Sequence, residues 1–257
     1  MRRTALVTGA SSGIGEATAT ALAARGYRVF GTSRHPESQR LEGVEFLPLD
    51  LEDDRSVEAL AGPLAEVDVL VNNAGESQSG PLEELPPDAL RRLFQVNVLA
   101  PVRLTQLAVP GMRERGYGRV VMVGSMLASF PLAYRSSYVA TKAALKGFSN
   151  GARHELSPFG VWLTTVEPGS INTGISERRT KYIAPDSAHR RDFETMLTAL
   201  DRNERAGVTA GRVAKTIVKA IETPRPRQRY AVGSNAPFVF ALRRAVPTAV
   251  TEKLALA

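Results

Sequence analysis

Short apolar runs alternate with longer segments of helical character along most of the chain. The runs are rich in Val, Leu and Ala, which is typical of strands buried on both faces of a parallel sheet. We expect seven strands, at residues 4–8, 27–32, 44–49, 67–71, 118–125, 162–166 and 229–232. Helices are expected between them, at residues 16–25, 53–65, 87–115, 136–159 and 208–222. This alternation predicts an α/β fold with a doubly wound sheet and ligands at the carboxyl ends of its strands.

Two segments depart from the alternation. Residues 174–203 are polar, basic and weakly patterned, which favours a mobile substrate lid inserted into the domain. Residues 237–257 form an apolar and basic tail in which residues 238–240 stand close to Arg243 and Arg244. Core packing is the first interpretation of this tail, and a dimer contact or a peripheral membrane contact stays open. With 257 residues and no internal repeat, we expect residues 1–257 to form one domain.

Composition narrows the chemistry. The chain has no cysteine, and its three histidines, His35, His154 and His189, lack the spacing of metal ligands, so we predict no metal site. No apolar run approaches the roughly 18 residues of a membrane span, and Met1 to Thr4 lead directly into the first strand instead of a signal-peptide core. We therefore expect a soluble, cytoplasmic protein.

The net charge of +7 is unevenly distributed. Residues 1–174 hold 17 basic and 18 acidic side chains, whereas residues 175–257 hold 16 basic and 8 acidic ones. Nothing in the basic part resembles a helix-turn-helix or an aromatic-basic RNA platform, so we expect no nucleic-acid partner. A solvated basic surface is the favoured interpretation, followed by a site for an anionic substrate or carrier.

A glycine-rich turn follows the first strand and precedes the first helix. Glycines allow a tight turn and close approach of a ligand, and the N–H groups at the start of a helix suit a diphosphate. The spacing is G-x-x-x-G-x-G, and its place between strand and helix indicates a dinucleotide site. The candidate contacts are Gly9, Ser11, Ser12, Gly13, Ile14 and Gly15.

Arg34 follows the second strand, where an NAD-preferring site usually carries an acid for the ribose 2′-hydroxyl. An arginine instead suits a 2′-phosphate through charge-assisted hydrogen bonds. We therefore predict NADP(H) in preference to NAD(H). The alternative is an ordinary exposed arginine of a loop.

Tyr138 and Lys142 stand four residues apart in a predicted helix, so both side chains leave the same face. An ammonium one turn away stabilises the anion that a tyrosine must form to exchange protons. Ser125 ends a predicted buried strand, where a hydroxyl faces the ligand crevice and can orient a substrate oxygen. Taken alone, a Y-x-x-x-K pattern is more often a packed ring beside a solvated amine, and the surrounding motifs reverse that preference.

Other polar groups stand at or near strand ends. The fourth strand is followed by Asn72, Asn73, Ala74 and Gly75. These residues form either an ordinary turn or a wall of the site that a flat ligand can approach closely. Asn97 lies on an otherwise apolar helix face, where it either satisfies backbone groups at a kink or holds a water next to Lys142.

Together, the glycine turn, the Asn72–Gly75 run, Asn97, Ser125, Tyr138-x-x-x-Lys142 and Pro168-Gly169 resemble the short-chain dehydrogenase/reductase family over roughly residues 4–232. More loosely, the sequence looks like the branch of 17β-hydroxysteroid and retinol dehydrogenases. The resemblance implies one Rossmann-type domain with a seven-stranded parallel sheet in the order 3-2-1-4-5-6-7, and a homodimer or homotetramer formed through the helices that carry Asn97 and Tyr138.

The resemblance also implies roles for single residues. Tyr138 matches the general acid/base, Ser125 the hydroxyl that holds the substrate oxygen, Lys142 the cofactor-ribose ligand beside the tyrosine, and Asn97 the proton-relay asparagine. The remaining implied cofactor contacts are Asp50 and Leu51 for the adenine, Asn73, Ala74 and Gly75 for the ribose side, and Pro168, Gly169, Ile171 and Thr173 for the nicotinamide and phosphates.

The implied activity is hydride transfer between NADP(H) and a ketone or aldehyde, hydrophobic or anionic, or in reverse the corresponding alcohol. The residues do not decide the direction. A non-catalytic NADP-sensing or nucleic-acid-binding Rossmann protein is the alternative, and the intact set of Asn97, Ser125, Tyr138 and Lys142 argues against it.

Overall fold

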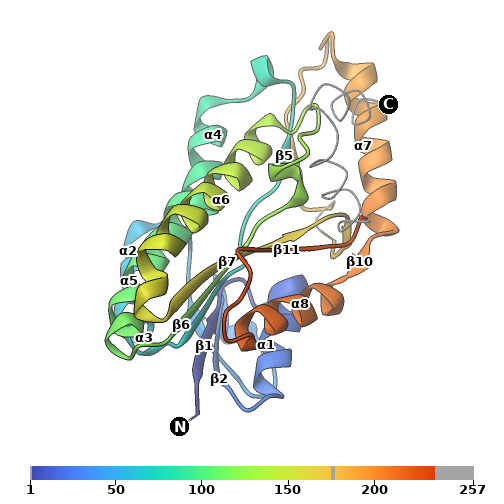
Figure 1. The fold of residues 1–257 in the computed structure, drawn as a ribbon. Coiled ribbons are helices and arrows are strands. Elements are labelled where there is room, and N and C mark those ends of the chain that lie inside the picture. Colours follow the sequence, from blue (N-terminus) through green and yellow to red (C-terminus); the bar gives the residue numbers. More distant parts are fainter. Residues whose placement is uncertain (1, 175–176, 235–257) are drawn as a thin grey trace, which may run out of the picture.

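The computed structural model describes residues 2–174 and 177–234. A seven-stranded sheet runs through the centre of this part of the chain (Figure 1), and every pair of neighbouring strands in it is parallel. In spatial order from one edge, the strands are β3 (Val44–Pro48), β2 (Arg28–Ser33), β1 (Thr4–Val7), β4 (Val69–Asn72), β6 (Gly118–Val123), β7 (Val161–Pro168) and β11 (Arg229–Val232). Counted within this sheet, the order is 3-2-1-4-5-6-7, so the expected fold class is confirmed.

Helices cover both faces of the sheet (Figure 1). On one face lie α2 (Asp54–Glu58), α3 (Ala61–Glu66), α5 (Ala100–Glu114) and α6 (Ser136–Leu156), with α4 (Pro87–Phe94) next to α6. The other face carries α1 (Gly13–Ala23) and α8 (Ala210–Glu222). Successive residues of a strand point to opposite faces. Accordingly, Leu70 packs under the first group of helices and its neighbour Val71 under the second.

Short elements lie beyond the carboxyl ends of the main strands. β5 (Gln78–Ser79) pairs with β9 (Thr180–Lys181), and β8 (Ile171–Asn172) pairs with β10 (Val208–Thr209), each in parallel. Among the described residues, 3₁₀ turns occur at Pro36–Ser38, Leu82–Glu84 and Met126–Ala128, and a fourth, Ser157–Phe159, precedes the start of β7.

Residues 174–203 are more regular than the weak pattern predicts, because they contain most of α7 (Arg190–Arg205). Its buried side chains are Phe193, Leu197 and Glu204. Two of these follow the helical spacing of four residues, but the last is a carboxylate. It is buried because Arg179 forms an ion pair with it, at 2.6 Å between Nη2 and Oε2. The apolar periodicity of the sequence therefore identifies only part of the buried face of α7.

Two expected helices are interrupted. The helix expected over residues 53–65 divides into α2 and α3, because Pro63 has no N–H with which to continue the hydrogen-bond ladder. Asp53 caps α2, as its carboxylate accepts a hydrogen bond from the N–H of Arg55 at 2.9 Å. The helix expected over residues 87–115 contains a π-helical turn, Gln95–Leu99, between α4 and α5. Within the described residues no helix is long and apolar enough to cross a bilayer. The expected tail at 237–257 lies outside them.

The close approach of Gly160, just before β7, to Gly116, just before β6, can be tested by substitution. Gly26, just before β2, serves as the comparison. Gly26 and Gly160 both have left-handed backbones, with φ of 81° and 77°. A Cβ at Gly26 would meet nothing within 4 Å, whereas one at Gly160 would lie 2.2 Å from the carbonyl oxygen of Gly116. We expect Gly26→Ala to lower the free energy of unfolding by about 1–2 kcal/mol, and Gly160→Ala to lower it clearly more. Urea unfolding measures both, and equal losses would contradict the close approach at Gly160.

Candidate active site

A cleft of about 640 Å³ runs along the carboxyl ends of the central strands. This is where parallel α/β sheets bind their ligands. The residues predicted from sequence that line it are Gly9, Ser11, Ser12, Gly13, Ile14, Arg34, Asp50, Leu51, Asn73, Ala74, Gly75, Tyr138, Lys142, Pro168, Ile171 and Thr173. Gly15, Asn97, Ser125 and Gly169 are predicted residues that are not part of the lining.

The glycine turn is shaped by close backbone packing. Gly9 has a left-handed backbone, with φ of 64°. A Cβ at Gly15 would lie 2.1 Å from the carbonyl oxygen of Gly9, so only glycine fits there. Ser12 precedes α1, and its side chain makes no capping hydrogen bond. The N–H groups of the first turn of α1 therefore remain available to an anion in the cleft.

Thr8 and Asn73 hold the glycine turn against the end of β4. The Thr8 hydroxyl accepts hydrogen bonds from the N–H groups of Asn73 and Ala74, at 2.9 and 3.0 Å. In return, the Asn73 amide donates to the carbonyl oxygens of Thr8 and Gly9, at 2.9 and 3.3 Å. Asn73 thus fixes the shape of the turn as well as lining the cleft. Thr8 is a positioning residue that the sequence motif contains but that we did not predict as part of the site.

Tyr138 and Lys142 come together in the cleft as the helical spacing predicts. Both side chains are buried, and the Lys142 ammonium lies 5.7 Å from the centroid of the Tyr138 ring. The ammonium also donates a hydrogen bond to the carbonyl oxygen of Val123 at 3.0 Å. Because Val123 ends β6, this bond fixes α6 relative to the strand end that leads to Ser125.

Asn97 lies behind the cleft, in the π-helical turn. Its carboxamide oxygen accepts from the N–H of Glu76 at 2.8 Å, and its NH₂ donates to the Glu76 carbonyl at 3.0 Å. It therefore satisfies the backbone of a neighbouring loop and not that of its own kink. A Cβ at Gly75 would meet the Asn97 oxygen at 2.8 Å and the Lys142 nitrogen at 3.6 Å, so these two polar groups converge behind Gly75.

Ser125 begins the short 3₁₀ turn after β6. Its hydroxyl oxygen accepts a hydrogen bond from the N–H of Leu127 at 3.1 Å. This bond leaves the hydroxyl hydrogen available, so the side chain can still donate to another oxygen.

The segment after β7 closes one side of the cleft. Thr173 packs on the glycine turn, since a Cβ at Gly13 would lie 3.5 Å from the Thr173 Cβ. Gly169 is not part of the cleft lining. A Cβ on this residue would lie 2.3 Å from the Ser234 hydroxyl oxygen. Its role is therefore close packing against the residues that follow β11.

The far end of the cleft carries Arg34, Asp50 and Leu51. Arg34 is exposed and has no hydrogen-bond or ion-pair partner among the described residues. Asp50 accepts a hydrogen bond from the N–H of Glu52 at 3.0 Å, which shapes the loop that follows β3.

Several lining residues were not predicted. Arg92 of α4 forms ion pairs with Glu52 at 2.9 Å and with Glu76 at 2.5 Å, and so joins two loops at the rim. Arg178 reaches the cleft from the 174–203 segment and donates to the carbonyl oxygen of Thr173 at 3.3 Å. The local sequence does not indicate that an arginine on a polar helix face or in a polar segment lines a binding site, because only the tertiary fold brings it to the cleft.

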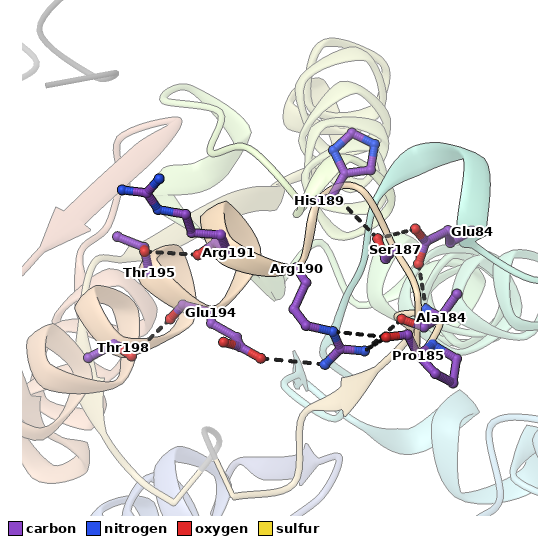
Figure 2. Close-up of polar contacts among 10 residues, drawn as sticks. All are labelled: Glu84, Ala184, Pro185, Ser187, His189, Arg190, Arg191, Glu194, Thr195 and Thr198. Carbon is purple, nitrogen blue, oxygen red and sulfur yellow. Dashed lines mark hydrogen bonds and ion pairs between the residues drawn. The ribbon is translucent and has the colours of Figure 1, made fainter.

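The 174–203 segment is tied to the body of the domain by Glu84 (Figure 2). The Glu84 carboxylate accepts hydrogen bonds from the N–H of Ala184 at 2.7 Å and from the Ser187 hydroxyl. Those two donors, the Ser187 hydroxyl first, lower the pKa of Glu84 below its ordinary value. Next to this contact, Arg190 donates to the carbonyl oxygens of Ala184 and Pro185, at 2.7 and 2.8 Å for its Nη2 (Figure 2).

Comparison with known proteins agrees with this geometry. The family described as short chain dehydrogenase matches residues 3–183. The chain belongs to the short-chain dehydrogenase/reductase family. Human 17-beta-hydroxysteroid dehydrogenase type 1 is 33% identical over 89% of this chain and 77% of its own length, and human retinol dehydrogenase 8 is 36% identical over 66% and 60%. These relatives confirm the expected likeness to the hydroxysteroid and retinol dehydrogenase branch.

Solved structures agree with the fold of this short-chain dehydrogenase/reductase. A short-chain dehydrogenase from Streptomyces avermitilis has a TM-score of 0.82 and 33% identity, covering 95% of this chain and 94% of its own. One from Burkholderia cenocepacia, solved in complex with NADP, has a TM-score of 0.80 and 26% identity, covering 100% and 98%. This short-chain dehydrogenase/reductase is thus an NAD(P)-dependent oxidoreductase acting on CH–OH or carbonyl groups of small molecules.

The cleft suits such a cofactor on its own geometry. The glycine turn leaves room and N–H groups that would suit a diphosphate, and Thr173 adjoins it. When bound, the nicotinamide would supply or accept the hydride, and the cleft of this short-chain dehydrogenase/reductase would bind and orient the cofactor.

The Glu84 contact gives a pH-dependent prediction. Since the pKa of Glu84 is lowered in the folded protein, its carboxylate stabilises the attachment of the 174–203 segment fully above the ordinary glutamate value of 4.5. That contribution is lost as the pH falls through the lowered pKa. We expect hydrogen-exchange protection of the Ala184 amide to hold down to this range and then fall. At neutral pH, Glu84→Gln should already reduce the protection, whereas Glu42→Gln at an exposed site should not. Equal protection in both variants would contradict the attachment.

Proposed function

We propose that this enzyme transfers a hydride between NADP(H) and a ketone or aldehyde, or the corresponding alcohol, with Tyr138 as the general acid/base. The observation that carries the proposal is the placement of Tyr138 in the cleft with the Lys142 ammonium 5.7 Å from its ring. A cation at this distance in a buried site favours the anion that a tyrosine forms when it gives up its proton. The pair is therefore suited to acid/base chemistry.

In the proposed mechanism Ser125 and Tyr138 hold the substrate oxygen. The Ser125 hydroxyl hydrogen is available because its oxygen only accepts from Leu127. During reduction Tyr138 donates its proton to the carbonyl oxygen, and during oxidation it takes the proton from the alcohol. Lys142 stabilises the charge on Tyr138 and binds the cofactor ribose. Asn97 holds the Glu76 backbone, lies with Lys142 behind Gly75, and takes the role of the proton relay.

The proposed preference for NADP(H) rests on Arg34. Its guanidinium lines the cleft at the end of β2 and is exposed, without a partner among the described residues. Such a group is free to form charge-assisted hydrogen bonds with a 2′-phosphate. The Burkholderia cenocepacia relative solved with NADP supports this choice.

The proposed substrates are hydrophobic carbonyl compounds. The names of two relatives, a 17-beta-hydroxysteroid dehydrogenase and a retinol dehydrogenase, refer to large apolar molecules. A suitable panel contains a 17-ketosteroid, retinaldehyde, a long-chain aliphatic ketone and a 3-oxoacyl thioester. The thioester tests whether an anionic carrier is preferred.

Replacing Tyr138 by Phe tests the assignment of the acid/base. We expect turnover of the panel carbonyls with NADPH to fall by roughly 10²- to 10⁴-fold, because the proton donor is lost. The affinity for NADPH, measured by cofactor fluorescence, should change little. Tyr117→Phe is the matched control, since its hydroxyl is buried without a hydrogen-bond partner among the described residues and lies outside the cleft lining. Undiminished turnover by Tyr138→Phe would refute the assignment.

Replacing Arg34 by Asp tests the cofactor preference. A hydrogen bond to a charged group contributes about 1.5–3 kcal/mol, so the ratio of NADPH to NADH affinity should fall by roughly ten- to a hundredfold. Fluorescence titration with both cofactors measures the ratio. Arg40→Asp makes the same change of charge on the same loop but outside the cleft lining, and should leave the ratio nearly unchanged. A ratio that Arg34→Asp does not alter would remove Arg34 from the 2′-phosphate site.

A further inference from the structure

A second buried cation lies against Tyr138. Arg135 immediately precedes α6, three residues before the tyrosine, and is 3% exposed. The central carbon of its guanidinium is 4.4 Å from the centroid of the Tyr138 ring, closer than the Lys142 ammonium at 5.7 Å. Neither the dinucleotide motif nor the Y-x-x-x-K pattern includes this residue.

Two hydroxyl groups hold the guanidinium in place. Nη1 of Arg135 donates to the Oγ atoms of Ser77 and Ser79, at 2.9 and 3.0 Å, while Nε has no partner among the described residues. Neutral oxygens do not cancel the charge of an arginine as a carboxylate would. The field of Arg135 therefore acts on its aromatic neighbour, Tyr138.

Unlike Arg179, Arg135 has no carboxylate partner among the described residues. Arg179 is also buried, but it forms ion pairs with Asp201 at 2.7 Å and with Glu204 at 2.6 Å. Burial lowers the pKa of Arg135 to about 10, and Tyr138, Glu204 and Asp201 oppose part of that shift, whereas Arg179 adds to it. Arg135 therefore stays protonated at neutral pH.

The anchor of Arg135 reaches into the 174–203 segment. Ser79 belongs to β5, which pairs with β9 directly after Arg179. The N–H of Thr180 donates to the carbonyl oxygen of Ser77 at 3.0 Å, and that of Tyr182 to the carbonyl oxygen of Ser79 at 2.9 Å. The placement of both serine hydroxyls thus depends on the part of the chain expected to cover the substrate.

We propose that Arg135 is a positioning residue for Tyr138, whose guanidinium fixes the plane of the phenol ring and, together with Lys142, favours the phenolate during proton exchange. This inference rests on the proposed role of Tyr138. The negative charge of a phenolate spreads into its ring, so a cation over the ring face is attracted to it as well as to the neutral ring. Burial strengthens both attractions, because water does not screen them.

The experiment compares Arg135→Met with Arg135→Lys over a range of pH. Met removes the charge and keeps much of the length, whereas Lys keeps the charge. The first readout is the near-ultraviolet absorbance of tyrosinate, taken as the difference between each protein and the same protein carrying Tyr138→Phe. The second is the pH profile of NADP⁺ reduction with the alcohol of the 17-ketosteroid, or of another panel carbonyl if that one is turned over faster.

In the oxidation direction Tyr138 must be deprotonated, so loss of a nearby cation moves the rising limb of the profile to higher pH. We expect Arg135→Met to move it by about one unit, with kcat at neutral pH about tenfold lower and the KM for NADP⁺ nearly unchanged. The Tyr138 absorbance should appear at correspondingly higher pH. In Arg135→Lys, both the pH profile and the Tyr138 absorbance should lie close to those of the native protein. Arg119→Met is the matched control, because Arg119 is also buried and lies 4.5 Å from the ring of Tyr117, outside the cleft lining.

If Arg135→Met does not fold, the double variant Ser77→Ala/Ser79→Ala replaces it, since this change releases the guanidinium but keeps the charge. It should shift the profile in the same direction by a smaller amount. Unshifted profiles and absorbance in the variants that fold would overturn the role of Arg135, even where Tyr138→Phe abolishes turnover. Undiminished turnover in Tyr138→Phe would instead refute the proposed function, which separates the two failures.

Discussion

The hydrogen bonds between Thr8 and Asn73 are the contact on which the cleft depends. They join the ends of β1 and β4, two central neighbours in the sheet, and fix the glycine turn and the Asn73–Gly75 wall relative to each other. Gly15 can then approach the Gly9 carbonyl closely, and the first residues of α1, Gly13 and Ile14, line the cleft without a side-chain cap at Ser12. Without this attachment the two loops that enclose the cofactor site would be positioned independently.

Two of the buried cations among the described residues, Lys142 and Arg135, lie next to Tyr138. Lys142 is held by the backbone carbonyl of Val123, and Arg135 by two serine hydroxyls, so neither cation is neutralised by a carboxylate hydrogen bond. Of the buried cations elsewhere, Arg179 has two acidic partners, whereas Arg119 donates to backbone carbonyl oxygens. Burying an unmatched charge is unfavourable, and it is retained most often where a function uses it. The placement of two such cations beside Tyr138 fits the proposed role of this tyrosine, which forms a transient anion.

The sequence predicted the framework of the site well. The parallel sheet and the glycine turn follow from local patterns, because a parallel strand and the turn after it are encoded by consecutive residues. The strand order and many of the lining residues of the cleft followed from the family resemblance. Asn97 was correctly placed among polar groups that need partners, but its partner, the backbone of Glu76, lies 21 residues away. The interruption at Gln95–Leu99 and the helix α7 were missed. Both depend on contacts with distant residues, such as the ion pair of Arg179 with Glu204.

By itself the sequence determined the fold class, the glycine turn and the pairing of Tyr138 with Lys142, since each is set by spacing along one strand or one helix. Only the tertiary structure showed which other side chains reach the cleft. Arg92 and Arg178 line the cleft without any local signal, because the packing of α4 and of the 174–203 segment brings them there. Arg135 is not part of the lining but lies against the Tyr138 ring, where two serines near and in β5 hold it. The contacts that hold Arg135 against Tyr138 come from Ser77 and Ser79, which are distant in sequence, because a helix by itself orients a side chain but does not supply the groups that hold it.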